Sequence, residues 1–138
     1  MGVNGEEIRK GINQLFMEQG WGKPKFQTIE NKGKTPDFWT DSSAYEFQRL
    51  TTWFSGEYPY PMVRFFTRYF HGKPHTVITD KGMCFHIWGR MDNKAFYVVD
   101  YADIKEHCGN PTQEATQSRS DTVVYFPRTI GRTYEVNL

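Results

Sequence analysis

Two acidic residues in adjoining extended segments are the first candidates for chemistry. Asp37 follows Pro36 near the start of one expected strand, and Glu46 lies inside the next, just before Gln48. Because alternate residues of a strand share a face, Glu46 and Gln48 are expected to point the same way. A hairpin of the two strands would bring Asp37 beside them. Two carboxylates that close suit a hard divalent cation such as Mg²⁺ or Mn²⁺, which activates water and stabilises charge on a phosphate.

Basic side chains follow these strands. Apolar residues between positions 62 and 70 recur at helical spacing, which predicts a second helix there. Arg64 and Arg68 fall on the opposite face of this helix, and Lys73 lies just beyond it. Arg binds phosphate through paired hydrogen bonds, so these residues and Arg49 are candidate nucleic-acid contacts.

The elements that position these residues follow from hydrophobic spacing and turn residues. An amphipathic helix is expected after Asn4, which can cap it, and Gly20 ends it. Extended segments are expected at 25–30, 36–40, 44–51, 75–80, 83–89, 95–100, 122–126 and 132–136. A short helical segment is expected at 102–107 and a polar loop at 109–120.

The order of these elements is helix, three strands, helix and then further strands, which is typical of an α+β fold with a largely antiparallel sheet. A length of 138 residues, with 38% hydrophobic and 17% aromatic residues, fits one domain over residues 1–138. Lys and Arg number 17 against 16 Asp and Glu, so a nucleic-acid surface would be a local basic patch.

Cysteine usage and hydropathy indicate the compartment. Cys84 and Cys108 are too few for a disulfide framework. With His86 and His107 they offer four zinc ligands, but the spacing matches no standard finger. No apolar run is long enough to cross a bilayer, and the N-terminal residues lack the pattern of a signal peptide, so we expect a cytoplasmic protein without a membrane contact.

The acidic motif has a family resemblance. Pro36-Asp37 followed by Glu46-x-Gln48 resembles the PD-(D/E)xK nuclease signature in its E-x-Q variant. The expected order of helix, three strands, helix and strand over residues 4–80 is similar to the core of that superfamily, the restriction-endonuclease-like fold. The pattern at 36–70 is also similar to CoiA-type competence nucleases. The resemblance covers somewhat over half of the chain.

The resemblance implies roles for particular residues. Asp37 and Glu46 would bind Mg²⁺ or Mn²⁺, and Gln48 would help to orient the attacking water. A glutamate of the first helix, Glu7 or its neighbour Glu6, would complete the catalytic site. The implied activity is divalent-metal-dependent hydrolysis of phosphodiester bonds in DNA, and a nuclease that cuts both strands would often be a homodimer.

Other interpretations of the same residues stay open. Asp37 can be a turn residue, Glu46 the solvent side of a half-buried strand, and Glu7 a partner of the N-cap amide. The basic residues can be the solvated face of an amphipathic helix.

Most members of the superfamily have Lys at the position of Gln48. Gln48 carries no charge that could stabilise the transition state. The alternative function is therefore a catalytically inactive, nuclease-like binding module that grips nucleic acid or acts as a phage or mobile-element inhibitor of a partner protein. A hydrolase of another polymer, such as a glycan, is a further alternative.

Overall fold

The computed structural model describes residues 5–30, 35–50, 53, 62–66, 85–108 and 123–138. It contains two α-helices in these ranges, α1 (Glu6–Gln19) and α2 (Tyr101–Cys108), and a 3₁₀ turn at Arg128–Ile130. The strands are β1 (Lys25–Phe26), β2 (Phe38–Trp39), β3 (Ala44–Leu50), β4 (Met62–Phe66), β5 (Phe85–Arg90), β6 (Ala95–Asp100), β7 (Val123–Pro127) and β8 (Arg132–Glu135). None of the described helices is long and apolar enough to cross a membrane.

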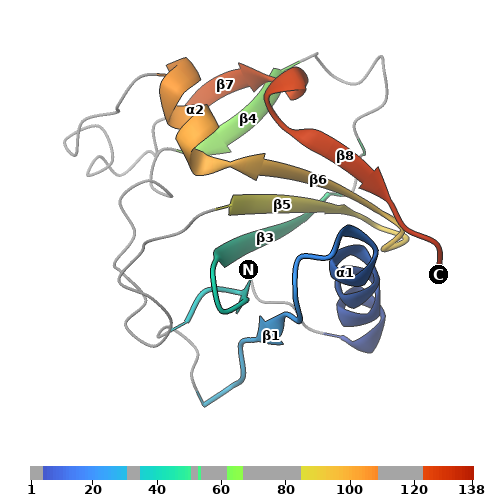
Figure 1. The fold of residues 1–138 in the computed structure, drawn as a ribbon. Helices are drawn as coiled ribbons and strands as arrows, with labels where there is room; N and C mark the ends of the chain where they lie inside the picture. The colour runs from blue at the N-terminus through green and yellow to red at the C-terminus, as the bar shows by residue number, and fades with distance from the viewer. Residues whose placement is uncertain (1–4, 31–34, 51–52, 54–61, 67–84, 109–122) are drawn as a thin grey trace.

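A six-stranded sheet in the order β1-β2-β3-β5-β6-β8 forms the centre of the fold (Figure 1). Among the described strands, β3 and β5 are the one parallel pair, and every other pairing is antiparallel. A parallel pair needs a crossover connection. The chain between β3 and β5 makes this crossover, and β4 belongs to it.

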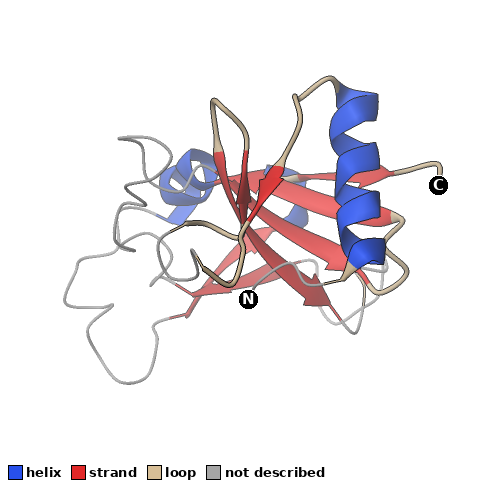
Figure 2. Cartoon of the chain, turned by 90° about the horizontal axis from the view of Figure 1, so that it is seen from below, coloured by secondary structure: helices blue, strands red, loops and turns tan. Residues whose placement is uncertain are grey.

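The sheet has a packed core on each face. α1 covers one face, as Figure 2 shows, whereas α2 and the β4–β7 pair lie on the other (Figure 1). The core under α1 is formed by Ile8, Ile12, Leu15, Phe16, Phe38, Tyr45, Phe47, Ile87, Phe96 and Val136. The core under α2 is formed by Trp88, Tyr97, Val99, Tyr101, Ile104 and Phe126. Alternate residues of β3 and β5 therefore belong to opposite faces, as strand geometry requires.

The first helix begins and ends near its predicted bounds. Its buried residues Ile8, Ile12, Leu15 and Phe16 recur at the predicted spacing. Gly20 ends the helix in the left-handed conformation, with its N–H bonded to the last turn. The N-cap is Gly5, which makes no side-chain capping bond, so the cap predicted at Asn4 is wrong.

The predicted second helix is wrong over Met62–Phe66. These residues form β4, which pairs antiparallel with β7, so that Arg64 lies opposite Tyr125. Apolar residues at 62, 63, 65 and 66 fit a helical face and a short strand equally well. Val and Phe favour the strand, and the partner that decides the outcome lies far along the chain.

The other predicted elements are confirmed with shorter or shifted bounds where the structure describes them. The segment at 25–30 is a strand only at Lys25–Phe26, and the helical segment at 102–107 extends over Tyr101–Cys108. The strand predicted at 75–80 and the loop predicted at 109–120 lie outside the described residues. The described residues form a mixed α and β fold with a mostly antiparallel sheet, as predicted, but Met62–Phe66 is a strand where a helix is expected.

Candidate functional site

Asp37 and Glu46 lie opposite each other at one end of the β2–β3 hairpin. Phe38 pairs with Tyr45 in this hairpin, and the same register places Asp37 across from Glu46. Opposed residues of an antiparallel pair share a face and have closely spaced side chains. Asp37 is only 5% exposed, and Glu46 is half-buried. The hairpin therefore brings the two carboxylates together as the sequence predicts.

Asp37 also has a structural role in this hairpin. The backbone N–H of Phe47 donates a hydrogen bond of 2.8 Å to Asp37 Oδ2. The backbone carbonyl of Asp37 accepts from the N–H of Gln27, which ties the same residue to the segment after β1. Asp37 is thus held by two neighbouring segments, and its side chain has a fixed position beside Glu46.

The pKa of the Glu46 carboxyl is raised well above its ordinary value beside Asp37. Burial is the largest cause that raises the pKa of Glu46 to about 8, and the charge of Asp37 and a side-chain hydrogen bond with it raise the pKa further. Two carboxylates at such close range cannot both ionise at low cost. At neutral pH the protonated form of Glu46 is therefore favoured, and in this form Glu46 can donate a hydrogen bond to Asp37.

Gln48 lies on the same face as Glu46, whereas Arg49 lies on the other. Leu50 packs against the core under α2, and by alternation Glu46 and Gln48 face that side. Arg49 is on the side of Phe47, and its Nη2 donates to the carbonyl of Met91 at 2.6 Å in the β5–β6 turn. Arg49 therefore lies away from the two carboxylates, and its role as a nucleic-acid contact stays a prediction.

The remaining predicted residues are dispersed. Glu7 is exposed in the first turn of α1, a helix that packs on the face opposite to Glu46. Arg64 belongs to β4 and not to a helix, so the predicted helical strip of basic residues is wrong at this position. Arg68 and Lys73 lie outside the described residues.

His86 is a polar residue beside the two carboxylates. The sequence did not predict that it lies at this site. It pairs with Glu46 across β3 and β5 and is fully buried. Its Nδ1 is 3.1 Å from the hydroxyl of Tyr101. The centre of its ring lies 4.1 Å from the ring centre of Trp88. Burial lowers the pKa of His86 to about 3, so the imidazole is neutral at physiological pH. The alternation of strand 85–90 identifies its face, but only the pairing of β5 with β3 brings it to Glu46.

The donor set fits a cation that keeps part of its water shell. No group of three or more His, Cys, Asp or Glu side chains with metal-binding geometry occurs among the described residues. Asp37 and Glu46 are therefore a pair of carboxylates without a third described ligand of these types. Mg²⁺ is commonly bound by one or two carboxylates and several waters, so this pair suits Mg²⁺ or Mn²⁺ better than a structural zinc ion.

Comparisons with protein-family models, curated proteins and solved structures found no match for this chain. A fold of this kind supports many unrelated activities. The fold alone therefore assigns no activity to this chain.

Proposed function

We propose that the protein is a divalent-metal-dependent nuclease that hydrolyses phosphodiester bonds in DNA in the cytoplasm. The observation that carries this proposal is the position of Asp37 directly across the hairpin from Glu46, where Asp37 is buried and Glu46 is half-buried. Buried acidic pairs of this kind are unfavourable without a proton or a cation between them. They are consequently more typical of sites than of structural surfaces.

Each residue of the pair has a distinct contribution to the proposed site. Glu46 is the more accessible carboxyl group and would be a direct ligand, and Asp37 would supply a second oxygen from a position fixed by Phe47. A bound divalent cation would lower the pKa of a coordinated water and stabilise charge on the phosphate. Gln48 shares the face of Glu46, and its amide can orient a water by hydrogen bonding.

The strand order gives further support. The elements α1, β1, β2 and β3 follow in the order that the nuclease resemblance implies, and the two strands that flank the acidic motif are adjacent. The connection between β3 and β5 contains β4 where a helix is expected. The support is thus strongest for the hairpin that carries the motif.

Paired substitutions test the proposal. Glu46→Gln and Asp37→Asn should each abolish cleavage of DNA in Mg²⁺ or Mn²⁺, and Mn²⁺ binding measured by calorimetry should be lost with it. Asp41→Asn is the matched control, because Asp41 is an exposed carboxylate of the same hairpin turn whose contact with Lys25 lies at the surface. A wild-type protein that cuts no DNA form with any divalent cation would exclude the enzyme.

A second candidate function is a catalytically inactive, nuclease-like binding module, which would grip nucleic acid or block a partner protein. The specific observation in its favour is that Asp37 Oδ2 already accepts a hydrogen bond from the backbone N–H of Phe47. Gln48 is also uncharged, so the site lacks the positive lysine side chain that most members of the superfamily have at this position. For this candidate, calorimetry should detect no Mn²⁺ site that depends on Asp37 and Glu46, whereas the nuclease requires one.

A further inference from the structure

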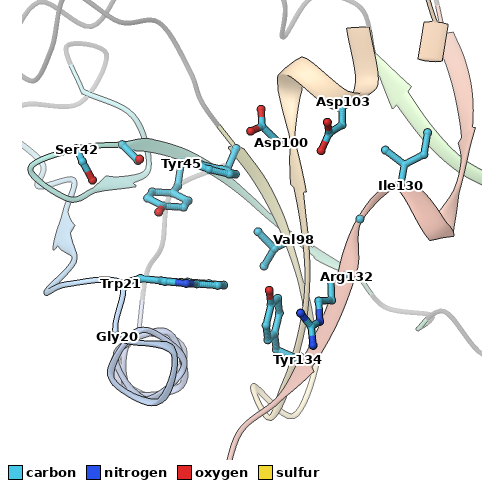
Figure 3. Close-up of a pocket in the computed structure, with 13 residues that line it drawn as sticks. Gly20, Trp21, Ser42, Tyr45, Val98, Asp100, Asp103, Ile130, Arg132 and Tyr134 are labelled. Atoms are coloured by element: carbon cyan, nitrogen blue, oxygen red, sulfur yellow. The ribbon is translucent and has the colours of Figure 1, made fainter. Parts of the chain in front are cut away.

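A groove of about 610 Å³ lies on the α1 side of the sheet, away from the carboxylate pair. It is bounded by the residues after α1, the β2–β3 turn, β6, β8 and the start of α2 (Figure 3). Tyr45 and Val98 of its floor belong to the face opposite to Glu46. Its volume is within the range of sites that bind small molecules, and nothing in the proposed nuclease chemistry uses it.

Aromatic rings form the wall and part of the floor of this groove. Trp21 meets Tyr134 edge to face at 5.1 Å, and Phe16 under α1 supports Trp21 from behind at 5.4 Å. Tyr45 lines the groove near the strand turn (Figure 3). The ring of Tyr45 is stacked with those of Phe38 and Phe85 and closes the floor. Trp21 is held edge to face by two other rings, so it keeps its orientation and offers a planar ligand a preformed surface for stacking.

Charged groups flank these rings. The guanidinium of Arg132 lies 5.4 Å from the centre of the Tyr134 ring. Asp103, exposed in the first turn of α2, points into the groove from the opposite end (Figure 3). Asp100 lies beside it, and its Oδ1 already accepts a hydrogen bond from the N–H of Ala102 at 2.8 Å. Asp103 is therefore the carboxylate best placed to accept hydrogen bonds from a ligand.

A second, smaller groove begins on the other side of Trp21. It shares Trp21 and Ser42 with the first groove, and its charged lining residues are Lys23, Lys25 and Asp41. Lys25 contacts Asp41 at 3.3 Å, whereas Lys23 is exposed. The first groove therefore has a hydrogen-bond acceptor in Asp103 and an aromatic ring in Trp21, and the second groove has a positive charge in Lys23.

We propose that this double groove binds an unpaired guanine nucleotide, with the base against Trp21 and the phosphate toward Lys23. An ionised carboxylate accepts hydrogen bonds and donates none. Guanine presents two adjacent N–H groups on its Watson–Crick edge, which match both oxygens of Asp103. Adenine and cytosine present an acceptor beside their amino group, which would face a carboxylate oxygen unfavourably. Proteins commonly read unpaired bases by this combination of stacking and edge hydrogen bonds.

The ligand can be a free mononucleotide or one base of a single strand, and both have this chemistry. The inference extends the proposed nucleic-acid function to a specific base, but it does not depend on the metal or on cleavage. Glu46→Gln should accordingly leave guanine binding unchanged. Loss of cleavage and loss of base recognition are thus separate outcomes.

Fluorescence anisotropy in EDTA tests the proposal with labelled oligo(dT) that carries one central dG, dI or dA. The dG strand should bind at least about tenfold more tightly than the dI strand, which lacks the amino group, and than the dA strand. Asp103→Asn should reduce this preference to about twofold or less. Glu106→Gln, an exposed acid in the same helix, is the matched control and should preserve it.

Substitution of Trp21 provides an independent measurement. Trp21→Ala should weaken binding of the dG strand by about tenfold or more, and Trp21→Phe should retain most of it, because stacking needs a ring. A urea unfolding curve for each variant separates lost stacking from lost folding. Competition by GMP identifies a mononucleotide site, and binding of the strand without such competition identifies a strand site. Equal affinity for dG and dI, or an unaffected Asp103→Asn variant, would overturn the proposal.

Discussion

Glu46 makes the stability of the fold depend on pH in a direction opposite to that of an ordinary carboxylate. The pKa of Glu46 is about 8 in the folded protein and 4.5 as an ordinary value, with burial as the main cause. The folded state therefore holds the proton more tightly than the unfolded state. The contribution of Glu46 to the free energy of unfolding is fully present below pH 4.5, declines as pH rises and is absent above pH 8. Each pH unit in this window corresponds to about 1.4 kcal/mol, so the upper bound is about 5 kcal/mol.

His86 acts in the opposite sense at lower pH. Its pKa is about 3 in the folded protein and 6.5 as an ordinary value, again because of burial. Its contribution is present above pH 6.5 and is lost as pH falls toward 3. Between pH 4.5 and 6.5 the two effects cancel. The free energy of unfolding should therefore show a plateau there, an acid limb that His86 produces and an alkaline limb that Glu46 produces.

The alkaline limb is the measurable consequence of the carboxylate pair. Between pH 6.5 and 8 the free energy of unfolding should fall by about 2 kcal/mol in the wild type. Glu46→Gln removes the titrating group and keeps its shape, so this limb should disappear and the variant should exceed the wild type in stability at pH 8.5. Glu106→Gln, an exposed acid, should retain the limb.

Urea unfolding followed by circular dichroism at pH 4, 5.5, 7 and 8.5, without divalent ions, gives these free energies. The reasoning is refuted if Glu46→Gln and the wild type lose stability in parallel between pH 6.5 and 8. A result of this kind would mean that Glu46 is ionised in the folded protein and holds no proton beside Asp37. Added Mn²⁺ should stabilise the wild type more at pH 8.5 than at pH 5.5, because the cation replaces that proton.

Two further predictions concern the packing that positions the site. Gly11→Ala should destabilise the fold by about 1–3 kcal/mol in urea unfolding, because the new Cβ would overlap the backbone carbonyl of Asn93. The cost of this overlap exceeds the gain in helix propensity of about 1 kcal/mol. Asn13→Ala on the exposed side of α1 should be neutral or stabilising, and an equal loss in both variants would contradict the packing argument. Tyr97→Phe should cost about 1–3 kcal/mol in the same assay, because its hydroxyl makes two hydrogen bonds that join β6 to the 3₁₀ turn. A loss below about 0.5 kcal/mol would contradict that role.

Local patterns in the sequence predicted the hairpin that carries Asp37 and Glu46. The acidic residues are close in sequence, the turn between their strands is marked by Asp and Ser residues, and alternation fixes the face of each side chain. α1 was likewise predictable, since its apolar residues recur at one helical period and Gly20 ends it. These features need no information from distant parts of the chain.

The features that the sequence did not predict depend on contacts between distant segments. Met62–Phe66 becomes a strand because β7 pairs with it, whereas the local spacing of its apolar residues fits a helix equally well. His86 joins Glu46 because β5 pairs with β3 in parallel, across a crossover connection. The groove beside Trp21 is formed by five segments, and none of them carries a recognisable binding motif.

The two acidic residues should not be regarded as equivalent in experiments on the proposed site. Asp37 accepts a backbone hydrogen bond inside the hairpin and is 5% exposed, so its replacement perturbs the fold as well as any cation. Glu46 is more accessible, and its neutral form is already the favoured one in the folded protein at pH 7. Glu46→Gln therefore resembles the resting protonated state in charge and shape. A loss of cleavage in this variant, with unchanged folding, would consequently point to chemistry at the carboxylate itself, which the Asp37 variant alone cannot do.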